Sequence, residues 1–101
     1  MKQENVKKLL SLLSNYVIEA SKIDSLENVT DDIARYLDLA ANAATTPLTL
    51  DEKGEMYYST VHALNCGSPE ANEEAFCIRL RALASGDDEL IDKIEYLHQV
   101  I

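Results

Sequence analysis

The sequence predicts an all-α fold, a compact bundle of about five antiparallel helices joined by short loops, in a single domain over residues 1–101. Apolar residues recur at three- and four-residue spacing through most of the chain, which is typical of amphipathic helices. Three glycines and two prolines are too few for a turn-rich β fold. A chain of 101 residues, 47% of them apolar, has enough material for one hydrophobic core.

The first two helices are expected over residues 3–23 and 30–45. Apolar residues from Val6 to Ile23 fall within one arc of a helical wheel, and lysines and polar side chains occupy the opposite side. Thr30 is a favourable N-cap for the second helix. The two acids that follow it would lie at the positive end of the helix dipole.

The third helix is expected over residues 50–65. Thr49 and Glu52 match the capping box, in which each side chain accepts a hydrogen bond from the other residue's backbone N–H. Gly67 is expected to end this helix in the left-handed conformation.

The fourth and fifth helices are expected over residues 69–85 and 87–100. Ser68 is an N-cap residue, and Pro69 suits the first helical position. Gly86 separates the two helices, and the acids after it favour a new helix start. Loops this short favour antiparallel neighbours.

The fourth helix carries two apolar stripes. The narrow stripe consists of Ala71, Ala75, Ile78 and Ala82, and the bulkier one of Phe76, Leu80 and Leu83. Arg79 separates the stripes on one side, and Glu74 with Arg81 separates them on the other. We favour a central helix with neighbours on two sides. The alternative is that one stripe stays exposed for another protein.

We expect no catalytic, metal or cofactor site. The chain has no glycine-rich phosphate loop and no serine in a nucleophile elbow. His62, Cys66, Cys77 and His98 do not follow the spacing of a zinc site. The expected helices hold the two cysteines too far apart for a disulfide, so free thiols in a reducing cytosol are predicted.

Two short segments resemble known families. Asp24-Ser25-Leu26 resembles the phosphopantetheine attachment motif of acyl carrier proteins, and Met56-Tyr57-Tyr58 with Ser68-Pro69-Glu70 is similar to a region of DNase-colicin immunity proteins. Acids instead of apolar residues follow the first segment, and the histidine-to-tyrosine signature is missing from the second. We therefore assign no family.

The chain is acidic, with 18 Asp and Glu against 9 Lys and Arg. This excess disfavours direct binding to nucleic acid and to anionic membranes, because both attract Lys and Arg. Eight of the acids fall in expected helix first turns, where the dipole favours them: Asp31, Asp32, Asp51, Glu52, Glu70, Asp87, Asp88 and Glu89. No apolar run could span a membrane and no signal peptide is evident, so a cytoplasmic location is expected.

The preferred functional prediction is a small, acidic, non-enzymatic protein-binding module of the inhibitor or immunity, antitoxin or chaperone type. A protein partner is therefore expected. A homo-oligomer is the first alternative, and an inhibitor that mimics nucleic acid is the second. The candidate interface residues lie on the fourth helix and near the C-terminus: Phe76, Arg79, Leu80, Leu83, Leu97 and Ile101.

Overall fold

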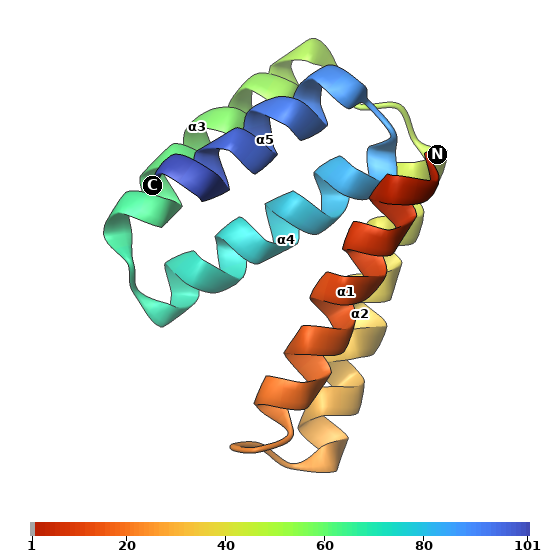
Figure 1. The fold of residues 1–101 in the computed structure, drawn as a ribbon, viewed down its shortest axis with the longest axis vertical. Helices are drawn as coiled ribbons and strands as arrows, with labels where there is room; N and C mark the ends of the chain where they lie inside the picture. Colours follow the sequence, from red (N-terminus) through yellow and green to blue (C-terminus); the bar gives the residue numbers. More distant parts are fainter. Residues whose placement is uncertain (1) are drawn as a thin grey trace.

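The computed structural model describes residues 2–101. Within them the chain forms five α-helices and no strand: α1 (Gln3–Ala20), α2 (Leu26–Thr45), α3 (Leu50–Cys66), α4 (Pro69–Ser85) and α5 (Asp88–Val100) (Figure 1). The all-α prediction is confirmed. Consecutive helices run antiparallel, whereas α3 and α5 run parallel to each other because each is antiparallel to α4.

α4 lies at the centre of the fold. It packs against the other four helices, with the α1–α2 hairpin on one side and the α3–α5 pair on the other (Figure 1). The lower part of the hairpin extends past α4, and the loop between α1 and α2 lies at its tip. The fold therefore consists of two helical pairs held together by a shared helix.

The two apolar stripes of α4 pack on these two sides. In the bulkier stripe, Leu80 contacts the cluster that holds Leu13 of α1 and Tyr36 of α2. In the narrow stripe, Ala75 packs with Ala63 of α3. Ala71 belongs to the same small cluster. Ile78 and Ala82 join the largest core cluster, which consists of Met56, Ile78, Ala82, Leu90, Ile94 and Leu97. The interpretation of α4 as a central helix with neighbours on two sides is confirmed.

Capping chemistry sets the ends of the later helices as predicted. The Thr49 hydroxyl accepts from the backbone N–H of Glu52, and the Glu52 carboxylate accepts from that of Thr49, both at 3.1 Å. Ser68 caps α4 through its side chain. Gly67 and Gly86 end α3 and α4 with φ of 72° and 71°. The bounds of α3, α4 and α5 agree with the prediction within one residue.

The start of α2 corrects the prediction. α2 begins at Leu26, because Ser25 and not Thr30 is its N-cap. The Ser25 hydroxyl accepts from the backbone N–H of Asn28 at 3.1 Å, and Asp24 accepts from Ser25 N–H and the Asn28 side chain. Two consecutive acceptors at residues 24 and 25 therefore stabilise an earlier start than Thr30 alone offers.

The end of α1 also differs from the prediction, since the helix stops at Ala20 and Ile23 lies exposed in the turn. Because α2 starts early, Asp31 and Asp32 lie beyond its first turn. The expectation that these acids sit at the helix start is wrong. Asp32 instead accepts a hydrogen bond from the Tyr16 hydroxyl of α1.

Leu80→Ala should lower the free energy of unfolding by about 2–5 kcal/mol, because it leaves a cavity where α1, α2 and α4 meet. Urea unfolding followed by circular dichroism measures the change. Leu37→Ala, on the exposed side of α2, is the matched control and should change stability by less than about 0.5 kcal/mol. Equal losses in the two variants would contradict the central role of α4.

Candidate protein-docking surface

Three of the six predicted interface residues lie in the core. Leu80 is 0%, Leu83 1% and Leu97 5% exposed. The alternative that the bulkier stripe of α4 stays open to a partner is therefore wrong, and with it the assignment of these residues to an interface. The physical reason is that the α1–α2 hairpin packs on that stripe, while Leu97 faces the cluster shared by α3, α4 and α5.

The other three predicted residues do not form one surface. Phe76 is half-buried in an aromatic cluster, with ring centroids 5.9 Å from Tyr16 and 5.0 Å from Tyr36. Arg79 is bound to a carboxylate of α5. Ile101 is exposed beyond the end of α5.

A groove of about 580 Å³ lies between α3 and α5. Its walls come from one face of each helix and from the turn before α5. The lining residues are Leu50, Lys53, Gly54, Tyr57, Tyr58, Asp87, Glu89, Leu90, Lys93 and Tyr96. We call this hollow the α3–α5 groove.

Helical periodicity explains why these residues share a surface. On each helix they recur at three- and four-residue intervals, which places them on one face. Because α3 and α5 run parallel, the two faces lie side by side. The lining spans residues 50–58 of α3, a length of about 12 Å at the rise of an α-helix.

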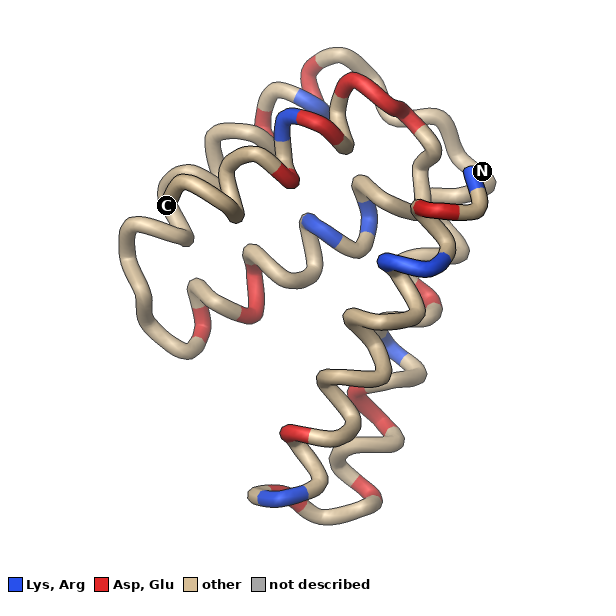
Figure 2. The backbone as a smooth tube through the Cα atoms, viewed as in Figure 1, with Lys and Arg blue, Asp and Glu red and all other residues tan. Residues whose placement is uncertain are grey.

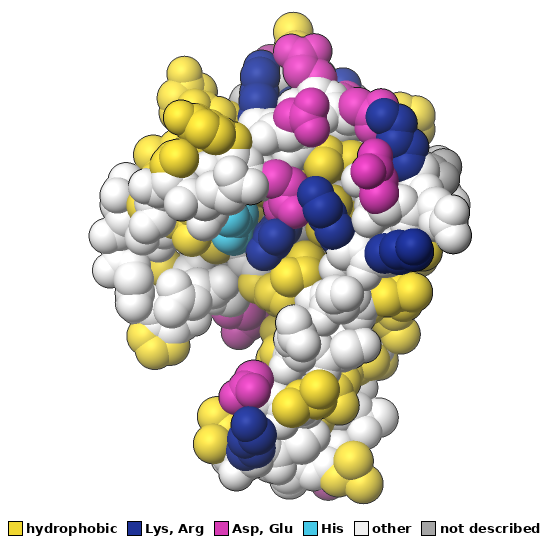
Figure 3. Space-filling model, in the orientation of Figure 1, with side chains coloured by type: hydrophobic (Ala, Val, Ile, Leu, Met, Phe, Trp, Pro, Cys, Tyr) yellow, Lys and Arg dark blue, Asp and Glu magenta, His cyan; other side chains and the backbone are white. Residues whose placement is uncertain are grey.

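Exposed aromatic and apolar side chains form part of the surface of the α3–α5 groove. Tyr58 is 74%, Tyr96 61% and Leu50 84% exposed. The rings of Tyr57 and Tyr58 pack edge to face, with centroids 5.6 Å apart. Figure 3 shows hydrophobic side chains standing out along the outer edge of this helical pair.

Gly54 lies in the groove one turn from both Leu50 and Tyr58. The backbone there does not require glycine: among residues 2–101, positive φ occurs at Gly67 and Gly86. A Cβ at residue 54 would meet no atom within 4 Å. Glycine in a helix interior costs about 1 kcal/mol relative to alanine. Gly54 thus weakens α3 and leaves an open notch in the groove.

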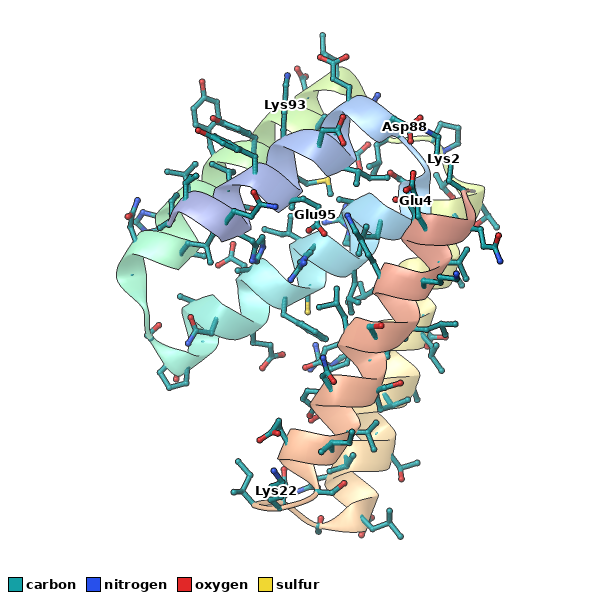
Figure 4. The ribbon with its side chains drawn as sticks, viewed as in Figure 1. Lys2, Glu4, Lys22, Asp88, Lys93 and Glu95 are labelled. Atoms are coloured by element: carbon teal, nitrogen blue, oxygen red, sulfur yellow. The ribbon has the colours of Figure 1, made fainter. Side chains whose placement is uncertain are left out.

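Ion pairs stand at one end of the groove. Lys53 binds Asp87 at 2.5 Å, and Lys93 binds Glu89 at 3.3 Å. The hydrogen bond from Lys53 is the main cause that lowers the pKa of Asp87. Lys93 points away from the core on the outer side of α5 (Figure 4).

The opposite end of the groove carries no charged side chain. Residues 56–66 and 96–101 contain no Asp, Glu, Lys or Arg, and Figure 2 shows this end of α3 and α5 without red or blue. The groove is therefore polarised. It runs from a charged end, at the N-termini of the two helices, to an uncharged end at the exposed Tyr96.

A second polar cluster lies where α1, α4 and α5 approach one another. Arg79 donates to both carboxylate oxygens of Glu95, at 2.5 and 3.0 Å, and Lys8 lies 3.7 Å from the same carboxylate. Lys2 binds Asp88 at 3.0 Å, next to the start of α5 (Figure 4). These contacts connect α1 and α4 to α5, so their role is structural.

His98 lies beside this cluster. Among residues 2–101, its Nε2 is the one buried side-chain nitrogen or oxygen without a hydrogen-bond partner. Burial lowers the pKa of His98, and the positive charge of Arg79 lowers it further, against an opposite effect of Glu95. The folded state therefore favours neutral His98.

Other sites find no support in the part of the chain that the structure describes. It contains no group of three or more His, Cys, Asp or Glu placed to hold a metal ion. Both cysteines are free, with Cys66 exposed and Cys77 half-buried. None of the described helices combines the length and the apolar character needed to cross a bilayer.

The α3–α5 groove was not predicted from the sequence. Neither Tyr58 nor Tyr96 belongs to a core-facing stripe, and Tyr58 was noted only within the segment similar to immunity proteins. The available signal was the presence of tyrosines outside those stripes. No protein-family model, curated protein or solved structure matches this chain.

Stability should fall as the pH drops below 6.5, the ordinary pKa of histidine, because the lowered pKa of folded His98 lets the unfolded chain bind a proton first. The contribution of neutral His98 to the free energy of unfolding is complete above the pKa that His98 has in the unfolded chain. It is lost as the pH falls through the lower pKa of His98 in the folded protein. Urea midpoints between about pH 7.5 and 5 measure it, above the range where carboxylates titrate.

His98→Gln should remove this part of the pH dependence, since glutamine does not titrate. Gln99→Ala, at an exposed position of α5 with no titrating group, is the matched control and should keep the wild-type slope. A wild-type midpoint that stays constant over this pH range would contradict the assignment.

Proposed function

We propose that this protein is a non-enzymatic protein-binding module that docks its partner in the α3–α5 groove. One observation carries the proposal: a hollow of about 580 Å³ with exposed tyrosines on its walls lies open between two parallel helices.

The residue types support a protein partner. Tyrosine is enriched at protein interfaces and at the positions that contribute most binding energy, because its ring contributes a large contact area and its hydroxyl tolerates water. Tyr58 and Tyr96 stand on opposite helices at the groove walls, and Leu50 extends the apolar surface. A partner that covers them removes exposed apolar surface from water.

The polar residues of the groove fit the anatomy of an interface. Lys53 and Lys93 are each bound to an acid from the start of α5, so these charges border the apolar part of the groove at one end. An apolar centre with a polar rim is typical of protein-binding surfaces. The free thiols Cys66 and Cys77 fit a reducing compartment, which supports a cytosolic location.

A homo-oligomer is a second candidate, favoured by a separate surface. Val6, Leu10 and Val17 form an exposed apolar edge along α1. Isolated exposed apolar residues are common, but three on one helix edge can pack against a second copy. Light scattering after size exclusion decides this, since a monomer mass at every concentration excludes it.

The double variant Tyr58→Ser, Tyr96→Ser should lose the partner while keeping the fold, because both side chains are exposed. Each lost contact of a central interface tyrosine costs on the order of 1–2 kcal/mol, so affinity should fall at least about tenfold. Immobilised wild type and variant are exposed to lysate of the native host, and retained proteins are quantified by mass spectrometry.

Leu26→Ser is the matched control, since Leu26 is an exposed apolar residue at the distant tip of the α1–α2 hairpin. A partner retained by wild type and control but lost by the tyrosine variant supports the groove. A partner that all three proteins retain equally rules out the groove as the docking surface.

A further inference from the structure

A second open apolar surface lies on the α1–α2 hairpin, on the side away from α4. On α1, the residues Val6, Leu10 and Val17 fall within about 40° of one another on a helical wheel. They are 37%, 56% and 38% exposed, although they border the residues of α1 that pack in the core. Figure 3 shows hydrophobic side chains along this edge of the hairpin.

α2 contributes the other half of this surface. Tyr36 and Ala40 are buried, and Leu37 and Ala41 follow them around the helix on the exposed side. Around each helix the side toward α4 comes first, then the side toward the other helix of the hairpin, then the exposed apolar side. Because the two helices are antiparallel, both exposed apolar sides face away from α4. We call this surface the hairpin outer face, which consists of Val6, Leu10, Val17, Leu26, Thr30, Leu37, Ala41 and Ala44.

The hairpin outer face carries no charge. Its arc on α1 and its arc on α2 contain no Asp, Glu, Lys or Arg, although 27% of the chain is charged and its net charge is −9. Two copies of so acidic a chain repel each other. Contact through an uncharged face leaves only charges at a distance, whose repulsion salt screens. A strongly charged partner would find no opposite charge on this face.

The two halves of the hairpin outer face are complementary in size. α1 presents the branched side chains of Val6, Leu10 and Val17, whereas α2 presents the small Ala41 and Ala44. A two-fold axis parallel to the helices would place α1 of each copy against α2 of the other, so that each copy supplies both the bulky and the small side. Every neighbouring pair of helices is then antiparallel, as in a four-helix bundle.

The packing inside the hairpin gives the register of this contact. Leu9 of α1 packs with Ala40 of α2, so Leu10 lies at the level of Leu37 and Ala41. Rotation about an axis parallel to the helices keeps each residue at its level. Leu10 of one copy therefore meets Leu37 and Ala41 of the other.

The area of the face is sufficient for a dimer. The 18 residues of α1 span about 27 Å, and two packed helices are about 20 Å wide. The contact therefore covers roughly 540 Å² on each copy, or about 1,100 Å² in total, just above the ~1,000 Å² expected of a biological interface. An interface at the low end of the size range predicts a dimer that dissociates on dilution.

We propose that two copies of this chain associate through the hairpin outer face, with α1 of each copy against α2 of the other in a four-helix bundle. This arrangement gives the homo-oligomer considered above a defined interface. It does not depend on docking in the α3–α5 groove, which lies on the other side of α4 and stays open in both copies.

Sedimentation equilibrium of the full chain tests the proposal, at concentrations from about 1 to 300 μM and at about 0.15 M salt, which screens exposed charges beyond about 8 Å. Wild type should form dimers that dissociate on dilution. Leu10→Lys and Leu37→Glu each place two unpaired charges in the contact, so each variant alone should associate at least about a hundredfold more weakly.

A 1:1 mixture of the two variants should recover the dimer. In the mixed dimer the new lysine of one copy faces the new glutamate of the other, while the symmetric contact keeps both leucines. This recovery is specific for α1 packed against α2. In a dimer with α1 against α1, the new lysine would face the leucine of the other copy and stay unpaired.

Ile18→Lys is the matched control. Ile18 is 56% exposed, as Leu10 is, but it lies on the polar side of α1. The control adds the same charge and should form dimers like wild type, as should Tyr58→Ser, Tyr96→Ser. Circular dichroism should be the same for all variants, because each replaced side chain is exposed.

Each contrary outcome is distinct. A wild type that is monomeric at every concentration overturns the proposal, and so does a dimer that survives Leu10→Lys or that Tyr58→Ser, Tyr96→Ser dissociates. Loss in both single variants without recovery in the mixture overturns the pairing of α1 with α2. A monomeric wild type that retains a lysate protein which Leu10→Lys loses has a different occupant, which overturns the second copy. The docking function keeps its own test, since Leu10→Lys changes no residue of the α3–α5 groove.

Discussion

The fold depends on the burial of two opposite faces of α4. Small residues on one face let α3 approach closely, as Ala75 against Ala63 shows, and bulkier residues on the other face fill the space to the α1–α2 hairpin. Removal of either contact would leave two helical pairs without a common core. The ion pairs of α5 with Arg79, Lys8 and Lys2 add polar contacts between the helical pairs at their edge.

The same constraint creates the α3–α5 groove and its charge. Because α3 and α5 both run antiparallel to α4, their N-termini lie at the same end. Acids occupy the first turns of both helices, where the dipole favours them, so the parallel arrangement concentrates them. Lys53 and Lys93 offset part of the resulting repulsion. The acidic patch thus follows from helix-start chemistry and needs no mimicry of nucleic acid to explain it.

The helices could be predicted because their ends depend on local chemistry. The exposure of a side chain and the pairing of helices depend on tertiary contacts. The capping box at Thr49 and the glycine stops lie within a few residues of one another in sequence, and they were predicted correctly. The start of α2 was missed because Ser25 and Thr30 are both good N-caps, and the added acceptor at Asp24 decided between them. The helical spacing of the stripe that contains Leu80 is the same whether that stripe lies in the core or at an interface. The spacing therefore could not reveal that Leu80 is buried.

The α3–α5 groove could not be predicted from the sequence for a related reason. The packing of α4 offers a comparison for the faces of the α3–α5 pair. Tyr58 and Tyr96 are 38 residues apart, and only the parallel packing of their helices places them on one surface. α4 is apolar on two faces and has a neighbour on each. The α3–α5 pair packs one face toward α4, and its other face, which carries Tyr58 and Tyr96 beside charged residues, lies open in residues 2–101. Tyrosine suits a face that spends time in water, since its hydroxyl stays hydrated while its ring remains ready for contact.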